Sequence, residues 1–347
     1  MEEDIRLYCG VSEGSWNFYP PAPGPLACVS PIYGTSTQRT RASTPCLPVG
    51  THVLQDSGAF SDGGAGVRLT CEEALRRQES HAQRYGYADQ IAARASYDLL
   101  IEEKWSEDEA TGGLCRRGRR RWTESAAEEA VEQTVQAARF LATSAHRNGI
   151  PCVLSAQGVS PRHYLRCVQQ IIPLMQDGDW LGFGGWCVVG KFPAQMLPIF
   201  RETMALVIPF LGREGIRRAH LWGVIYAPAL ADLLWLCSQY QITLSTDSIG
   251  PQVRPALGRW GYADWCDWSY CSAPSLPPER EQEAARRPVK TADGHFISLP
   301  HVKGRHRAEH VRQVRAWLGR FRQRACYPPA EPAWWRQPHQ LALAGLR

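Results

Sequence analysis

The sequence predicts an α/β protein built on a (β/α)8 TIM-like barrel that carries a basic C-terminal extension. Two observations predict this fold: short apolar runs rich in β-branched residues alternate with longer stretches of helical periodicity, and each run ends in a small or polar residue. In such an alternation the strands form a parallel sheet and the helices cover it. Eight strands of this kind are enough to close a barrel. The eight runs are Ile5–Cys9, Leu26–Ser30, His52–Asp56, Tyr97–Glu102, Cys152–Gln157, Trp180–Gly184, Ala219–Gly223 and Ile242–Asp247.

Two of the intervening stretches show clear helix signals. Ser160 followed by Pro161 combines an N-cap residue with a proline at the first helical position, which favours a helix start there. Before the fifth run, small and apolar residues recur at helical spacing, namely Ala130, Val131, Thr134, Val135, Ala138 and Leu141. The connection at 31–51 is rich in Ser, Thr and Pro and shows no helical stripe, so it departs from the barrel pattern.

The composition is that of a globular chain. It has 347 residues, of which 44% are hydrophobic and 21% charged, which excludes the disordered, collagen-like and coiled-coil classes. The start MEEDIRLYCG is acidic where a signal peptide is basic, and the most apolar stretch, 197–211, holds Arg201 and Glu202. We therefore expect a cytoplasmic protein with no membrane partner, whose twelve cysteines are reduced thiols.

Basic residues gather towards the end of the chain. Residues 286–347 contain 13 Lys and Arg against 3 Asp and Glu, a net charge of +10, so residues 1–285 carry −5 of the total of +5. Only 4 of the 39 basic residues are lysines, and arginine is the better fork for phosphate oxygens, which favours a nucleic-acid partner. We expect a catalytic barrel at 1–250 and, at 251–347, an extension packed on it with an arginine-rich amphipathic helix at 305–321.

Polar residues and glycines end the predicted strands, and on a barrel those ends meet at one mouth. Asp56 and Asp247 would form a pair of carboxylates across a pocket, which suits displacement at a sugar carbon. Gln157 offers a donor and an acceptor to a purine edge, and glycines let a flat ring lie against the backbone. Taken singly, an Asp after a strand is more often a helix cap and a Gly-Gly is more often a turn, so the hypothesis depends on their joint placement at the strand ends. The other candidates at these ends are Ser57, Gly58, Glu102, Glu103, Gly184, Gly185, Trp222, Gly223 and Ser248.

The order and spacing of these segments resemble those of the tRNA-guanine transglycosylase family between residues 56 and 248. The segment DSGAF at 56–60 is similar to the family's DSGGF, AQG at 156–158 to VQGG, GGWCVVG at 184–190 to GGLAVGE, and LWGV at 221–224 to LMGVG. The segment STDS at 245–248 falls where the family carries its nucleophilic aspartate. Near the N-terminus, Tyr8-Cys9-Gly10 followed by Trp16 is more similar to the DpdA branch, the 7-deazaguanine DNA-guanine transglycosylases.

The resemblance implies a pentosyltransferase that exchanges one base for another. Asp247 would attack the anomeric carbon of a guanine nucleotide, while Asp56 protonates the leaving guanine and then deprotonates the incoming 7-deazaguanine. Gln157 and the backbone at 184–185 would read the purine edge together with an acid from the fourth run, either Glu102 or Glu103. Trp222 replaces the family's methionine beneath the base and keeps an apolar platform there.

Departures from the family pattern favour DNA over tRNA. Lys191 replaces the family's glutamate, which favours a neutral 7-cyano-7-deazaguanine over a cationic aminomethyl base. The family's Pro-Thr-Arg after the nucleophile is replaced by IGPQ at 249–252, which argues against recognition of a tRNA anticodon loop. The expected function is therefore DNA-guanine transglycosylation, acting with other proteins of a modification pathway. The alternatives are a tRNA-guanine transglycosylase and a non-catalytic nucleic-acid-binding subunit, which would need neither Asp56 nor Asp247.

The resemblance also raises a structural zinc, which the family holds with three cysteines and a histidine. That pattern is absent, and the replacement candidates are Cys266 and Cys271 with His306 and His310, which are spaced one helical turn apart. Packed thiols and solvated histidines explain these four residues equally well. No organic cofactor is expected.

Two arginine clusters could hold the phosphates of a polynucleotide without reading its sequence. The members singled out are Arg116, Arg117, Arg119, Arg120 and Arg121 in a loop after the fourth run, and Arg305 and Arg312 on the late helix. A solvated loop and a solvated helix face are the competing interpretations.

Overall fold

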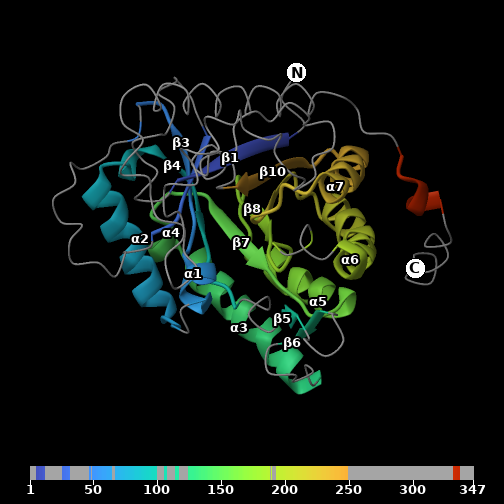
Figure 1. Ribbon diagram of the computed structural model, residues 1–347. Helices are drawn as coiled ribbons and strands as arrows, with labels where there is room; N and C mark the ends of the chain where they lie inside the picture. The colour runs from blue at the N-terminus through green and yellow to red at the C-terminus, as the bar shows by residue number, and fades with distance from the viewer. Residues whose placement is uncertain are drawn as a thin grey trace, which may run out of the picture.

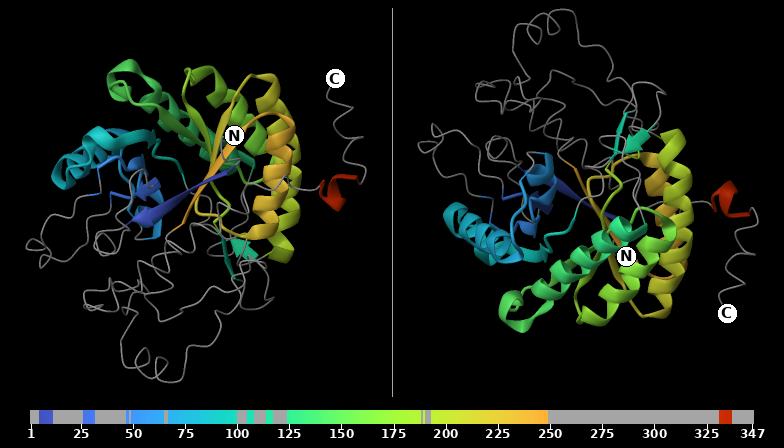
Figure 2. Two further views of the ribbon diagram at one scale, coloured as in Figure 1. Left: turned by 90° about the horizontal axis from the view of Figure 1, so that it is seen from above. Right: turned by 90° about the horizontal axis from the view of Figure 1, so that it is seen from below.

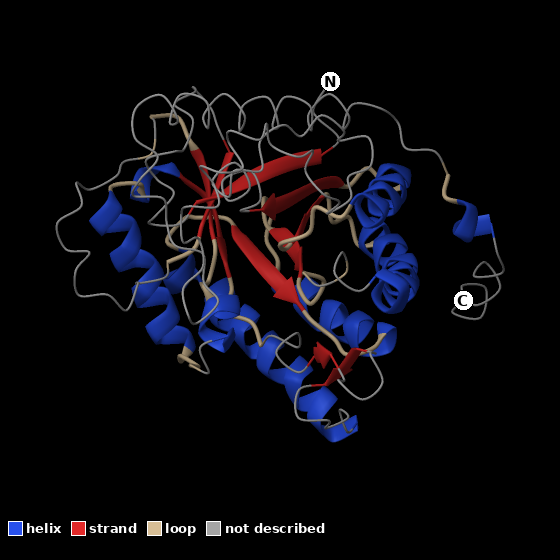
Figure 3. Ribbon diagram, viewed as in Figure 1, coloured by secondary structure: helices blue, strands red, loops and turns tan. Residues whose placement is uncertain are grey.

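Eight parallel strands close into a barrel in the computed structural model, in the order β1-β10-β9-β8-β7-β4-β3-β2 (Figures 1 and 3). The model describes residues 5–11, 26–31, 47, 49–64, 67–99, 105–107, 114–116, 124–187, 189, 193–248 and 331–336. The barrel strands are β1 (Ile5–Val11), β2 (Leu26–Val29), β3 (His52–Gln55), β4 (Ile91–Ala95), β7 (Cys152–Ala156), β8 (Trp180–Phe183), β9 (Arg218–Leu221) and β10 (Thr243–Ser248).

Helices surround the strands, with α2 on one side of the barrel and α6 and α7 on the opposite side (Figures 1 and 2). The α-helices are α1 (Ala59–Gly64), α2 (Cys71–Tyr85), α3 (Glu124–Ala142), α4 (Ser144–Arg147), α5 (Pro161–Ile171), α6 (Pro193–Arg213) and α7 (Ala227–Gln239). Short 3-10 helices are η3 (Ala88–Gln90), η6 (Ile172–Leu174) and η8 (Ala333–Arg336), and β5 (Trp105–Glu107) pairs antiparallel with β6 (Leu114–Arg116) outside the barrel.

The predicted α/β barrel is confirmed in its strands, with one correction. Seven of the eight apolar runs coincide with barrel strands to within two residues at either end, but the fourth strand is Ile91–Ala95 and not the predicted Tyr97–Glu102. The true strand, IAARA, holds a single β-branched residue, so its sequence signal is weaker than that of the apolar run behind it. All of 32–46 and all of 251–347 except 331–336 lie outside the described residues, so the C-terminal extension and the division at residue 250 stay predictions.

The barrel interior is a separate core of mixed character. Alternate residues of a strand point to opposite faces, so one row of each strand faces inward and the other packs against helices. The inward cluster consists of Tyr8, Cys28, Leu54, Ala93, Ala95, Val153 and Trp180. Larger aliphatic residues form the outer core between β7, β8, β9, β10 and their helices. The inward cluster fills the barrel below the carboxyl ends of the strands, so inward side chains at those ends rest on a solid core.

The helix signals read from the sequence are confirmed where the structure describes them. Ser160 caps α5 by accepting a hydrogen bond from the backbone N–H of His163, with Pro161 at the first helical position. The predicted stripe of α3, from Ala130 to Leu141, is buried against the barrel. Alanine and glutamate, which are strong helix formers, are common in α3, and packing of the buried stripe adds the tertiary part of its stability.

Helix α6 is, among the described helices, the one long and apolar enough to span a membrane by length and composition. Half of its most apolar stretch is buried, including Phe200 and Met204, and it packs between α5 and α7. Among the described residues, Cys28, Cys71, Cys152, Cys167, Cys187 and Cys237 are thiols that form no disulfide.

A buried ion pair braces the amino ends of β7 and β8. Arg147 and Asp179 are paired by two hydrogen bonds of 2.7 Å, and Arg147 also donates to the carbonyl oxygens of Ala142 and Leu174. The Asp179 carboxylate accepts further from the backbone N–H groups of Cys152 and Gln176, at 2.8 Å each. Both carboxylate oxygens of Asp179 therefore accept two hydrogen bonds each. A buried ion pair is stable only when its polar atoms are satisfied in this way.

Candidate active site

The candidate residues occupy the inward rows of neighbouring strands, one layer beyond the core. Ser155, Gly182, His220 and Ser245 are register partners across β7, β8, β9 and β10, so these positions share the inward face. Because the side-chain period of a strand is two, the next inward positions are Gln157, Gly184, Trp222 and Asp247. Residues far apart in the sequence thus meet at the carboxyl ends, where barrel enzymes place their chemistry.

Asp56 follows β3 and its carboxyl lies in a poorly solvated position. Burial raises the pKa of Asp56, and the negative charge of Asp247 raises it further, while hydrogen bonds from Ser30, Gly58 and Ser57 lower it. The backbone N–H of Ser57 donates to Asp56 Oδ1 at 2.6 Å. A carboxyl whose pKa is raised by burial and a like charge holds its proton to a higher pH than an exposed aspartate, which suits a general acid.

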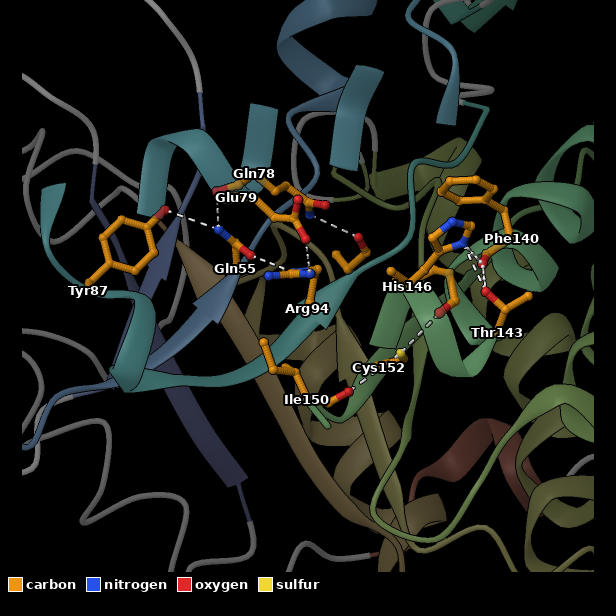
Figure 4. A network of polar contacts seen from close by, with 12 residues as sticks. Gln55, Gln78, Glu79, Tyr87, Arg94, Phe140, Thr143, His146, Ile150 and Cys152 are labelled. Atoms are coloured by element: carbon orange, nitrogen blue, oxygen red, sulfur yellow. Dashed lines mark hydrogen bonds and ion pairs between the residues drawn. The ribbon is translucent and has the colours of Figure 1, made fainter. Parts of the chain in front are cut away.

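Helix α2 holds the chain on either side of Asp56. Gln78 donates both hydrogens of its side-chain amide, one to the carbonyl of Asp56 at 3.1 Å and one to that of Ala95 at 3.0 Å. Gln55 donates to the carbonyl of Gln78 and accepts from Arg94 Nε at 2.8 Å (Figure 4). This buried network ties the carboxyl ends of β3 and β4 together and so sets where the chain leaves both strands.

Asp247 stands at the end of β10 with one oxygen anchored. Its Oδ1 accepts from the backbone N–H of Gly223 at 2.7 Å and lies 3.2 Å from Nε2 of His220. Gly223 has a φ of 67°, which favours glycine at the turn that aims this N–H. No described residue donates to Oδ2, and the side chain is 17% exposed, so Oδ2 is the oxygen left without a hydrogen bond from the described residues.

Asp98 completes the site, although the sequence does not predict it. It lies three residues after β4, is 7% exposed, and accepts a hydrogen bond at Oδ2 from the amide of Gln157. Burial raises the pKa of Asp98 to about 6, against the opposing effect of the Gln157 bond. The fourth strand was assigned too late in the chain, so Glu102 or Glu103 was expected in this role, and both lie outside the described residues. Placing the strand at the alanine-rich IAARA would have brought Asp98 to the mouth.

Gly184 leaves the space that the Asp98–Gln157 pair occupies. A Cβ on Gly184 would lie 2.6 Å from Gln157 Nε2 and 3.1 Å from Asp98 Oδ2. Gln157 Oε1 is buried and has no hydrogen-bond partner among the described residues. A carboxylate and an unused amide oxygen beside a flat glycine form a surface for a planar molecule that carries hydrogen-bond donors.

Trp222 forms a fixed apolar wall next to this pair. Its Nε1 donates to Ser155 Oγ at 3.0 Å, and its ring meets His220 edge to face at 4.2 Å between centroids. Gly182 makes room, because a Cβ there would approach Trp222 Nε1 to 2.6 Å. The ring is therefore pre-oriented for stacking.

The remaining predicted residues divide into placed and undescribed ones. Ser57 is buried beside Asp56, its carbonyl accepts from Arg77 at 2.7 Å, and Gly58 and Gly185 have φ values of 81° and 85°. Ser248 ends β10. Arg116 is described only as backbone at the end of β6, and outside the described residues lie Glu102, Glu103, Arg117, Arg119, Arg120, Arg121, Lys191, Cys266, Cys271, Arg305, His306, His310 and Arg312.

Within the described part of the chain, no three His, Cys, Asp or Glu side chains converge to hold a metal ion. The predicted zinc ligands all fall elsewhere, so the zinc site stays a prediction. Among the described candidates, the structure brings together Asp56 with Asp247 and Asp98 with Gln157 and Gly184.

Such a site can deliver a carboxylate nucleophile from one side and a proton from another to a planar, donor-bearing molecule. No protein-family model and no curated protein matches the chain. The transglycosylase resemblance therefore rests on the motifs alone.

Proposed function

We propose that the chain is a DNA-guanine transglycosylase that replaces guanine by a 7-deazaguanine base through a covalent aspartyl-glycosyl intermediate. The observation that carries this proposal is the pairing of two carboxyl groups, Asp56 and Asp247, whose charges interact beside the Asp98–Gln157 pair. Two carboxyls with different environments at one mouth support separate roles as acid and nucleophile.

In the first half-reaction Asp247 Oδ2 attacks C1′ of the nucleotide. The C1′–N9 bond breaks, its electron pair goes to the guanine, and the proton of the Asp56 carboxyl neutralises the leaving base. In the second half the Asp56 carboxylate takes the N9 proton of the incoming base, N9 attacks C1′, and Asp247 leaves. The raised pKa of Asp56 favours the protonated start that this cycle needs.

Guanine and 7-deazaguanine share the edge that the Asp98–Gln157 pair would read. The Asp98 carboxylate accepts from N1–H and the 2-amino group, and the unused Gln157 Oε1 offers a further acceptor. Trp222 stacks on the ring face. The two bases differ from each other only at position 7, which is away from this edge. One pocket can therefore bind both the leaving and the incoming base.

The choice of DNA and of a 7-cyano base rests on sequence departures. Lys191 replaces the family's glutamate, IGPQ at 249–252 replaces Pro-Thr-Arg, and the arginine clusters suit a phosphate backbone. The target guanine must leave any stack to reach Asp247, as in other enzymes that act on a base.

A labelling experiment tests the proposal. The protein is incubated with labelled 7-cyano-7-deazaguanine, or labelled guanine, and either plasmid DNA or tRNA, and label in each polymer is measured. Label in DNA is expected from the wild type and from Asp177→Asn, an exposed control. Label in tRNA alone overturns the choice of DNA, and label in neither overturns base exchange. Exchange that survives in Asp247→Ala overturns the mechanism.

A further inference from the structure

We propose that His220 is a positioning residue that fixes Oδ1 of Asp247 and so commits Oδ2 to attack. The catalytic meaning of this inference rests on the proposed function, but the contact itself can be tested without it. His220 was not among the residues expected from the sequence, although it stands two positions before Trp222 on the inward row of β9.

His220 is fully buried at the centre of the barrel, one layer below the mouth. Its ring touches Tyr8 and Trp180 at centroid distances of 6.0 and 6.4 Å and packs more closely against Trp222. A buried imidazole among aromatic rings needs partners for both nitrogens, because an unpaired polar atom there costs free energy.

The two partners of the ring lie on the same strand, β10, two residues apart. Nδ1 is 2.8 Å from Ser245 Oγ and Nε2 is 3.2 Å from Asp247 Oδ1. Ser245 Oγ is also 3.2 Å from the carbonyl oxygen of Ala219, to which its single hydrogen can donate. The ring is thus held at both nitrogens, and its orientation towards Asp247 is set from below.

The position of the proton follows from the acceptors. A carboxylate oxygen can only accept, so an attractive contact with ionised Asp247 requires a hydrogen on Nε2. This holds whether Ser245 donates to Nδ1 of a neutral ring or accepts from Nδ1 of a charged one. In both cases Oδ1 receives two hydrogen bonds, from Gly223 and His220, and Oδ2 receives none from a described residue.

Loss of this contact should lower the rate of attack and leave base binding intact. With Gly223 alone as donor the carboxylate can turn about its bond to Cβ, and misplacing a reacting atom by about 1 Å costs about 100-fold. Asp98 and Gln157, which would read the purine edge, bond to each other, and Trp222 keeps its bond to Ser155.

Three variants separate positioning from packing. His220→Gln can place an amide N–H near the site of Nε2, whereas His220→Asn can reach only the site of Nδ1, and His220→Phe keeps the ring but no donor. For base exchange into DNA we expect His220→Gln within about tenfold of the wild-type kcat. His220→Asn and His220→Phe should fall about 100-fold in kcat, and His220→Phe, which keeps a ring against Trp222, should leave KM for the base unchanged. Equal kcat values for the Gln and Asn variants, or a change confined to KM, overturn the inference.

A spectroscopic measurement keeps the inference apart from the proposed function. The ¹⁵N shifts of His220, assigned by the signal lost in His220→Gln, report which ring nitrogen carries hydrogen at neutral pH. We expect a protonated Nε2 whose shift changes in Asp247→Asn. If this is seen but the wild type exchanges no base, the proposed reaction fails and the positioning of Asp247 stands. An unprotonated Nε2 whose ¹⁵N shift is unchanged in Asp247→Asn overturns the inference, whatever the exchange assay shows.

Discussion

Asp98 is costly to the folded state at neutral pH, because a buried carboxylate loses its hydration. Its pKa is raised to about 6 in the folded protein, above the ordinary value of 3.8. Between these two values the folded state binds more protons than the unfolded one, so stability falls as pH rises through this window. The cost is full above about pH 6 and disappears below about pH 4.

We therefore expect Asp98→Asn to be more stable than the wild type at neutral pH, by on the order of 1–3 kcal/mol. Urea unfolding at neutral pH and near the ordinary pKa of an aspartate measures the difference, which should shrink at the lower pH. The same variant should lose base exchange, because a neutral amide cannot accept from both guanine donors. Asp89→Asn, an exposed control, should change neither property. A destabilised Asp98→Asn at neutral pH would contradict this account.

Individual site residues differ in how far sequence could predict them. Asp56, Gln157 and Asp247 stand at the ends of apolar runs with clear strand patterns. The sequence therefore predicts that they lie at the carboxyl ends of strands. Asp98 follows a strand whose alanines hide it, and His220 lies inside a strand where a histidine has no local signature. Those two roles depend on contacts between residues 27 and 59 positions apart.

At the scale of elements, β8 supports the site by what it lacks. Gly182 lies in its inward row and Gly184 directly follows the strand. A Cβ on Gly182 would clash with the Trp222 ring, and one on Gly184 would clash with the Asp98–Gln157 pair. Neither glycine has a positive φ, so their requirement is for space and not for an unusual backbone.

Gly184→Ala should therefore raise KM for the base, by about tenfold or more, because a clash with Gln157 displaces the edge-reading pair at a cost of about 1–3 kcal/mol. Steady-state kinetics of base exchange measures this. Gly182→Ala is the matched comparison, since it pushes on Trp222 and Ser155 and should weaken stacking but leave the preference for guanine over other purines. Wild-type KM in Gly184→Ala would show that the pair does not bind the base.

Element boundaries were predictable where pattern and packing agree. Ser160 with Pro161 and the buried stripe of α3 carry local signals that tertiary structure reinforces. The sequence does not predict β4 because its inward residues, Ala93 and Ala95, are small enough for the narrow barrel interior but have low strand propensity.

The whole molecule has the candidate site at one end of the barrel and a buried ion pair at the other. Asp56, Asp98, Gln157 and Asp247 lie at the carboxyl ends of their strands, while the Arg147–Asp179 pair ties the amino ends of β7 and β8. In barrels of this kind the amino-terminal face serves stability, and the carboxyl-terminal face is free to vary for function.

Asp179→Ala should accordingly lower the free energy of unfolding by about 3–5 kcal/mol, since Arg147 is left as an uncompensated buried charge. Chemical denaturation measures the loss, and kcat per folded molecule should stay at the wild-type value. Glu128→Ala is the matched control, because its pair with Arg166 is exposed and contributes about 0–1 kcal/mol. A selective loss of kcat in Asp179→Ala would contradict the division between the two ends.

The sequence by itself determined the α/β class, seven barrel strands and the two carboxylates at the ends of β3 and β10, because period and punctuation are local properties of the chain. Only the tertiary structure decided that Asp98 pairs with Gln157 and that His220 holds Asp247. These partners come from different strands, and their meeting depends on barrel register, which no single segment encodes.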